Sequence, residues 1–281
     1  MNIFTTIIFS AVVGISSCLN AKPFVSIMLK GQLGNQMFQI AAATSLALDN
    51  GAIAVCPDLV TQKQWDTFYN YQKILFRVDT VQKGPVKSNY FDPLSIYRPI
   101  PYSPNMRAEG WFQSEKYFDH HRKEILELFA PPESTLEYIN TYYGDALSHP
   151  CTVSIHHRCY LKEDAKGIYH PTQTLDYYLK AMAYYPEDAP FVVCSNNIAW
   201  CKQNFAHIPR NFIYSEEKPH IDIFLMAMCK HNIVANSSFS WWSAYLNTNP
   251  DKIITAPKQW FAETSGSDFK DIIPASWIAI Q

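Results

Sequence analysis

The second half of the chain alternates short apolar runs with amphipathic stretches, and this alternation restricts the possible folds more than any other feature. Each apolar run is followed, after a few polar residues, by a stretch whose apolar positions have helical spacing. Such an order predicts a parallel sheet covered by helices on both faces, with ligands bound at the carboxyl ends of its strands. The expected strands are 152–155, 190–194, 232–235 and 252–255, and the expected helices are 175–184, 198–205, 221–229 and 241–247.

The segment 235–246 follows one of these strands and is the most informative stretch of the sequence. Four small polar residues occupy five positions ahead of two adjacent tryptophans. Asn236, Ser237 or Ser238 is expected to cap the next helix, and the free N–H groups and dipole of such a helix favour a bound anion. The same residues are also typical of a well-capped helix with tryptophans in the core. The segment alone leaves both interpretations open.

A glycine-containing turn follows the first expected strand, 25–29. Gly31 and Gly34 allow a sharp turn and a close approach of backbone to a ligand. Asn35 and Gln36 offer amide donors at the start of the next helix. The dinucleotide fingerprint needs a third glycine and a later acid, and a P-loop needs Gly-Lys-Ser/Thr, so the turn matches neither.

Together these segments resemble the α-1,2-fucosyltransferases (glycosyltransferase family 11), which are related to the α-1,6- and protein O-fucosyltransferases. The resemblance extends over nearly the whole chain after the N-terminal apolar segment. Its blocks, in chain order, are residues 31–39, 110–118, 154–158, 195–201, 222–246 and 251–261.

The resemblance implies an α/β fold of the GT-B type, with two Rossmann-like domains that each hold a parallel sheet. Residues 22–148 are expected to form the acceptor-side domain, in which the loop-rich stretch 84–106 shapes the acceptor site. Residues 149–281 are expected to bind the GDP-sugar. A helix is expected over 113–129.

The implied reaction moves L-fucose from GDP-β-L-fucose to a hydroxyl of a galactose-terminated glycan, in α-1,2 linkage and with inversion. A departing diphosphate is stabilised either by a divalent metal or by cationic and N–H donors. The chain has no Asp-x-Asp motif, and the resemblance implies a metal-independent enzyme that needs no cofactor.

The resemblance also gives individual residues roles. Arg158 is expected to bind the diphosphate as a bidentate donor, and His156, on the same face of the chain, is expected to hydrogen-bond the donor. Asn35 is expected to reach into the cleft, and Asp222 to accept hydrogen bonds from guanine. Without the resemblance, Arg158, His156 and Asp222 would be interpreted as a surface ion pair, a core histidine and a helix-start acid. The remaining expected donor-binding residues are Gly34, Asn236, Ser237, Ser238 and Phe239.

The chain departs from the family pattern at two blocks. Relatives carry His-x-Arg-Arg-Gly-Asp-Tyr where residues 156–160 read His-His-Arg-Cys-Tyr, so Cys159 replaces an arginine and the Gly-Asp step is missing. The usual Ser-Asp-Asp is Ser-Asn-Asn at 195–197. Glu163 or Asp164 could reach back to replace a lost carboxylate. Three hypotheses follow: an active α-1,2-fucosyltransferase, a transferase of the same fold with another donor or acceptor, and a weakened protein that binds GDP or glycan.

Composition agrees with a globular enzyme. Charged residues make up 17% and aromatic residues 15% of the 281 residues, and the net charge of −2 argues against a nucleic-acid partner. The seven cysteines are odd in number and include no CxxC pair, so they indicate neither a zinc site nor a disulfide scaffold.

The N-terminal segment, residues 1–21, is expected to be separate from the fold. Residues 3–15 are apolar, which is typical of a signal peptide or membrane anchor, although the positive n-region is missing. A genuine first strand is the alternative. An anchor would associate the protein with a membrane or the secretory pathway, and its absence would leave the protein cytoplasmic.

Overall fold

The computed structural model describes residues 22–281 except 94–95, 161–168, 264–265 and 267. The N-terminal segment 1–21 lies outside the described residues, as do Glu163 and Asp164. Within the described part of the chain, no helix is long and apolar enough to cross a membrane.

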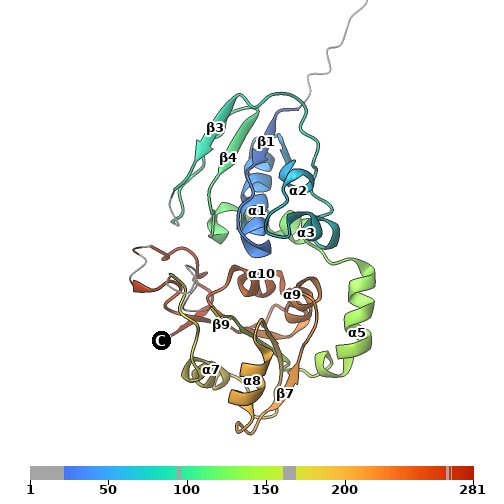
Figure 1. Cartoon of the computed structure of the whole chain (residues 1–281), viewed down its shortest axis with the longest axis vertical. Helices are drawn as coiled ribbons and strands as arrows, with labels where there is room; N and C mark the ends of the chain where they lie inside the picture. The colour runs from blue at the N-terminus through green and yellow to red at the C-terminus, as the bar shows by residue number, and fades with distance from the viewer. Residues whose placement is uncertain (1–21, 94–95, 161–168, 264–265, 267) are drawn as a thin grey trace, which may run out of the picture.

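The first half of the described chain is built on a parallel sheet with strand order β2-β1-β4-β3. Strand β1 is fully buried and leads through the glycine turn into the long helix α1 (Figure 1). Up to the end of this sheet the elements are β1 (Phe24–Ile27), α1 (Leu33–Asp49), β2 (Ile53–Val55), α2 (Asp58–Thr61), α3 (Thr67–Lys73), β3 (Ser88–Phe91) and β4 (Met106–Glu109).

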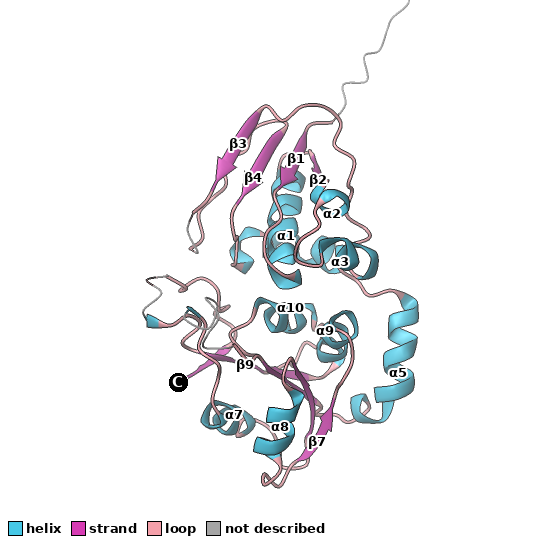
Figure 2. Cartoon of the chain, in the orientation of Figure 1, coloured by secondary structure: helices cyan, strands magenta, loops and turns pink. Residues whose placement is uncertain are grey.

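The second half holds a larger parallel sheet with strand order β10-β9-β8-β5-β6-β7. Helices α9 and α10 cover the face that looks toward the first half, and α7 and α8 cover the opposite face (Figure 2). The elements are β5 (Val153–His157), α7 (Leu175–Met182), β6 (Pro190–Ser195), α8 (Ile198–Phe205), β7 (Asn211–Tyr214), α9 (Pro219–Met228), β8 (His231–Ile233), α10 (Ser238–Leu246), β9 (Ile254–Pro257) and β10 (Ile278–Ile280). The predicted alternation and the predicted parallel sheet are therefore confirmed.

The predicted domain boundary near residue 148 falls between α5 (Glu133–Leu147) and β5. Helix α5 crosses from the first half to the second and packs against α9 (Figure 1). The assignment of the two halves to acceptor and donor stays a prediction.

The prediction of a single helix over residues 113–129 is wrong. Two short 3-10 turns, η1 (Glu115–Tyr117) and η2 (Asp119–His121), precede a short helix, α4 (Arg122–Leu128). The helical conformation is interrupted at Phe118, whose φ of −149° and ψ of −4° are not helical. This break buries Phe118 against the tryptophans of α10, so tertiary packing outweighs the local helical pattern.

The stretch 84–106 is also more regular than expected, because β3 lies inside it and pairs with β4. Residues of β3 alternate between half-buried and exposed positions, as on an edge strand.

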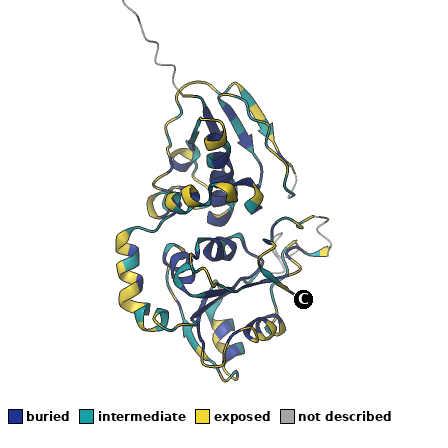
Figure 3. Cartoon of the chain, turned by 180° about the vertical axis from the view of Figure 1, so that it is seen from behind, coloured by how far each residue is buried: buried dark blue, intermediate teal, exposed yellow. Residues whose placement is uncertain are grey.

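A continuous apolar core joins the two halves. Phe38 of α1 packs against Trp241 and Trp242 of α10, with ring centroids 4.4 and 5.2 Å apart. The facing surfaces of α1 and α10 are accordingly buried (Figure 3). The two halves therefore share a core at the point where the predicted site residues lie.

Candidate functional site

Arg158 directly follows β5, at the carboxyl end of the larger sheet. Its guanidinium carbon lies 5.5 Å from the centroid of the Tyr160 ring. Among the described residues no carboxylate forms an ion pair with Arg158. An arginine at this edge without a counter-ion is suited to bind an anion.

His156 lies on β5 with its ring 5.4 Å from that of Phe239, at the start of α10. Burial, together with the nearby Arg158 and His157, lowers the pKa of His156 to about 3, so the imidazole is neutral at pH 7. Its Nδ1 atom has no hydrogen-bond partner within the described part of the chain. Because buried polar atoms are nearly always paired, this nitrogen is a candidate for contact with a ligand.

The turn before α10 presents uncapped backbone. Ser237 occupies the N-cap position with extended φ and ψ of −138° and 125°, but no side chain caps the helix. The predicted side-chain cap is therefore wrong: the Ser240 hydroxyl closes the turn instead, accepting from Ala235 N at 3.2 Å and donating to Ser237 O at 3.2 Å. The N–H groups of Ser238 and Phe239 stay open at the positive end of the helix dipole.

The side chain of Asn236, which was expected to bind the donor, is instead hydrogen-bonded within the protein. Its amide nitrogen donates to the carbonyls of Pro171 (2.8 Å) and Trp260 (3.0 Å). Its amide oxygen accepts from Gln173 at 3.2 Å. The side chain thus holds the walls of the turn together, and its own hydrogen bonds are made inside the protein.

The glycine turn of the first half contacts the α10 turn directly. Gly31 has a φ of +78°, which favours glycine, and a Cβ added to Gly34 would lie 2.5 Å from the carbonyl carbon of Ser238. Only glycine at position 34 allows the two helix starts to approach this closely. Asn35, in the first turn of α1, accepts a hydrogen bond from Gln113 Nε2 at 2.7 Å.

Asp222 lies in the first turn of α9 and is buried, with 8% of its surface exposed. Burial raises its pKa to about 6, opposed by a hydrogen bond from the Ser215 hydroxyl, 2.6 Å from Oδ1. Its other partner is the thiol of Cys194, which is the β6 neighbour of His156 in the sheet. Asp222 therefore lies on the same face as His156, one strand away.

The structure adds residues that sequence patterns did not identify. Asn196 pairs with the backbone of Cys159 in both directions: its Oδ1 accepts from Cys159 N at 2.8 Å, and its Nδ2 donates to Cys159 O at 2.9 Å. The Thr172 hydroxyl likewise accepts from Tyr160 N and donates to Tyr160 O. The Tyr160 hydroxyl donates to Asn236 O at 3.0 Å. These bonds fix the chain on the carboxyl side of Arg158, where Cys159 replaces an arginine and the Gly-Asp step before Tyr160 is missing.

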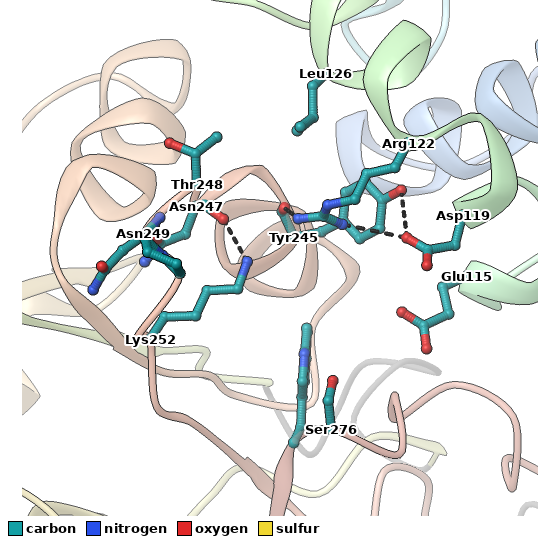
Figure 4. A pocket seen from close by; sticks show the side chains of 12 residues that line it. Glu115, Asp119, Arg122, Leu126, Tyr245, Asn247, Thr248, Asn249, Lys252 and Ser276 are labelled. Atoms are coloured by element: carbon teal, nitrogen blue, oxygen red, sulfur yellow. Dashed lines mark hydrogen bonds and ion pairs between the residues drawn. The ribbon is translucent and has the colours of Figure 1, made fainter.

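A cavity of about 440 Å³ lies elsewhere, at the carboxyl end of α10 (Figure 4). Arg122 donates to the carbonyl of Tyr245 there, and Lys252 donates to that of Asn247. Burial lowers the pKa of Lys252 to about 8, and Arg122 adds to this effect. No predicted site residue lines this cavity, because the α10 turn is at the other end of the helix.

Comparisons with known proteins agree with the fold. The sequence model of glycosyl transferase family 11 matches residues 7–281. The chain is similar to the O-antigen biosynthesis glycosyltransferase WbnK of Escherichia coli, with 30% identity over 89% of this chain and 98% of the relative. It is also similar to an α-1,2-colitosyltransferase of Escherichia coli, with 28% identity over 90% of this chain and 97% of the relative. Galactoside α-(1,2)-fucosyltransferase 2 of Mus musculus is 27% identical over 77% of this chain and 66% of its own length.

The fold is similar to that of the α-1,6-fucosyltransferase NodZ, which comes from Bradyrhizobium. Its structure with GDP gives a TM-score of 0.53 at 16% identity, over 79% of this chain and 91% of NodZ. The fold class expected from the sequence, a GT-B-like arrangement of two parallel sheets, is thereby confirmed. The chain belongs to glycosyl transferase family 11.

Proposed function

We propose that this glycosyltransferase moves L-fucose from GDP-β-L-fucose to a galactoside hydroxyl, forming an α-1,2 linkage with inversion and without a metal ion or other cofactor. One observation carries the proposal: Arg158, which lacks an acidic partner among the described residues, stands beside the uncapped start of α10. Tyr160 joins the two, because Arg158 lies over its ring and its hydroxyl donates to the carbonyl of Asn236, in the turn before α10, at 3.0 Å. A cation and free N–H groups at one point are what a metal-free transferase needs to stabilise a departing diphosphate.

In the proposed reaction the acceptor hydroxyl attacks the anomeric carbon from the face opposite the diphosphate. The bond from that carbon to the phosphate oxygen breaks, the hydroxyl releases its proton to solvent, and the configuration changes from β to α. Arg158 and the N–H groups of Ser238 and Phe239 take up the negative charge that develops on the leaving GDP. His156, held neutral by burial, donates or accepts one hydrogen bond at the nucleotide.

Asp222 is proposed to recognise the guanine. A carboxylate can accept from both the N1–H and the exocyclic amine of this base, and one oxygen of Asp222 is already oriented by Ser215. Asn35, held by Gln113, is proposed to face the acceptor from the first half. Gly34, Asn236 and Ser237 act by shaping the turn.

A second candidate is a transferase of the same kind with a different donor sugar. The specific observation in its favour is that the match to this chain covers 97% of the length of the colitosyltransferase but 66% of the length of the mouse fucosyltransferase. The replacement at Cys159, next to Arg158, is compatible with altered specificity or with weakened turnover.

The test is transfer of radiolabelled fucose from GDP-fucose to lactose and N-acetyllactosamine by the full chain, in the presence of EDTA. We expect α-1,2-linked product, with GDP-colitose as the competing donor in a parallel assay. Transfer of colitose but not fucose would favour the second candidate. Binding of GDP without any transfer would indicate the weakened protein, and failure to bind GDP would refute the donor site itself.

A further inference from the structure

Two adjacent histidines and one aspartate converge on a single point at the far end of α1. Asp49 is the last residue of α1, and His120 and His121 belong to η2. The Nε2 atom of His120 lies 3.1 Å from both carboxylate oxygens of Asp49, and that of His121 lies 2.8 Å from Oδ1. The three ligand-type atoms all lie within 4.8 Å of one another.

These separations are close to those in a tetrahedral metal site. With metal–ligand bonds of about 2.0–2.1 Å, neighbouring ligand atoms are about 3.3 Å apart. The carboxylate of Glu124 approaches the other ring nitrogen of His121, with Oε2 3.9 Å from Nδ1. A carboxylate on that side favours the proton on Nδ1 and leaves Nε2 free to bind a cation, an arrangement common around metal-bound histidines.

The cluster is held on rigid elements and is open to solvent. Helix α1 is buried along most of its length, and Arg122, the residue after η2, is tied to the carbonyl of Tyr245 at 2.7 Å. The side chains of Asp49 and His120 are 43% and 50% exposed, which leaves room for an entering ion and its remaining water ligands.

We propose that Asp49, His120 and His121 bind a divalent transition-metal ion such as Zn²⁺ or Ni²⁺. Two imidazoles and one carboxylate suit these ions better than Mg²⁺ or Ca²⁺, which prefer oxygen ligands. The site is remote from the proposed chemistry, because α1 (Leu33–Asp49) separates it from the glycine turn by about 24 Å along the helix axis. The ion therefore ties α1 to η2 and stabilises the fold, and it takes no part in transfer.

The test uses tag-free full chain stripped with EDTA and titrated with Ni²⁺ by calorimetry. We expect one saturable site and a melting temperature about 5–10 °C higher at 100 times Kd. Asp49→Asn, His120→Gln and His121→Gln should each weaken Ni²⁺ binding at least about tenfold. His207→Gln, an exposed histidine outside the cluster, is the matched control and should bind as the parent does.

Two results would overturn the proposal: no saturable binding by the parent chain, or equal binding by the three cluster variants. Co²⁺ separates the histidine site from adventitious binding to cysteines, because a thiolate ligand adds a charge-transfer band that an imidazole and carboxylate site lacks. GDP binding measured in EDTA serves as the check that each variant is folded, and it should be the same in all of them.

Discussion

Gly34→Ala has two opposing effects on stability, a gain in helix propensity and a steric clash, and the structure shows that the clash is larger. An alanine in a helix is favoured over glycine by about 0.8–1 kcal/mol. At position 34 the added Cβ would lie 2.5 Å from the Ser238 carbonyl carbon and 2.6 Å from Phe239 N, where ordinary contacts are 3.4–4 Å. Since both neighbours are backbone, α1 and α10 must separate by roughly 1 Å. Overpacking of this kind costs about 1–3 kcal/mol, and rigid neighbours place it at the upper end, so we expect net destabilisation of about 2 kcal/mol.

The effect on activity should exceed the effect on stability. The peptide that must move, Ser238–Phe239, carries the N–H groups proposed to bind the diphosphate, and a displacement of about 1 Å in a catalytic group lowers rates by about 100-fold. The assay is urea unfolding together with kcat/KM for transfer from GDP-fucose.

Gly144→Ala is the matched control for this experiment. Gly144 lies inside α5, and a Cβ there meets no atom within 4 Å. We expect it to stabilise the protein by about 0.5–1 kcal/mol and to leave activity unchanged. If Gly34→Ala stabilised the protein as much as the control does, the close approach of α1 to α10 would be refuted.

Three further predictions concern the proposed donor site. Arg158→Ala should lower the rate of transfer by about 100-fold or more with an unchanged circular dichroism spectrum. Arg158→Lys keeps the charge but not the bidentate geometry, so its rate should lie between those of Arg158→Ala and the parent chain. Asn196→Asp loses the donor to Cys159 O and should reduce kcat/KM about tenfold. Asn197→Asp should not, because an aspartate there would still accept from Trp200 N at the start of α8. For Asp222, folding raises the pKa from 3.8 to about 6, so the penalty is absent below about pH 4 and grows to about 3 kcal/mol as pH rises through 6. Asp222→Asn should therefore be more stable than the parent chain at pH 8 but equal to it at pH 4 in urea unfolding, and equal stability at both values would contradict the assigned pKa.

The parts of the fold that follow from periodicity were predictable. Helix α8 begins and ends where its pattern predicts, and β5 and β6 are buried almost throughout because both faces of the sheet are covered. The failures have a common cause in tertiary contacts. The pattern around Phe118 is helical, yet the chain turns there to stack this ring on Trp242, 5.3 Å between centroids.

In the candidate site, too, some features followed from sequence patterns and others depend on tertiary contacts. The order of elements alone placed Arg158 and His156 at the carboxyl edge of the larger sheet and Gly34 just after a strand of the smaller one. The pairing of Asn196 with Cys159 depends on side-chain orientation across two loops, which no local pattern encodes. Asn236 was expected to face the donor, but three partners from distant segments orient its amide inward.

The sequence allowed two interpretations of segment 235–246: an anion site, or a capped helix with core tryptophans. The two interpretations apply to different parts of the segment, the turn and the helix that follows it. Trp241 and Trp242 are fully buried and pack against Phe38 of α1 and Phe118, so α10 is part of the core that joins the halves. Interfaces between moving domains are usually more polar than this. The apolar contact therefore holds the start of α10 in a fixed position against the glycine turn. The tryptophans position the N–H groups ahead of them, so the turn that we propose to bind the donor is preformed before any nucleotide binds.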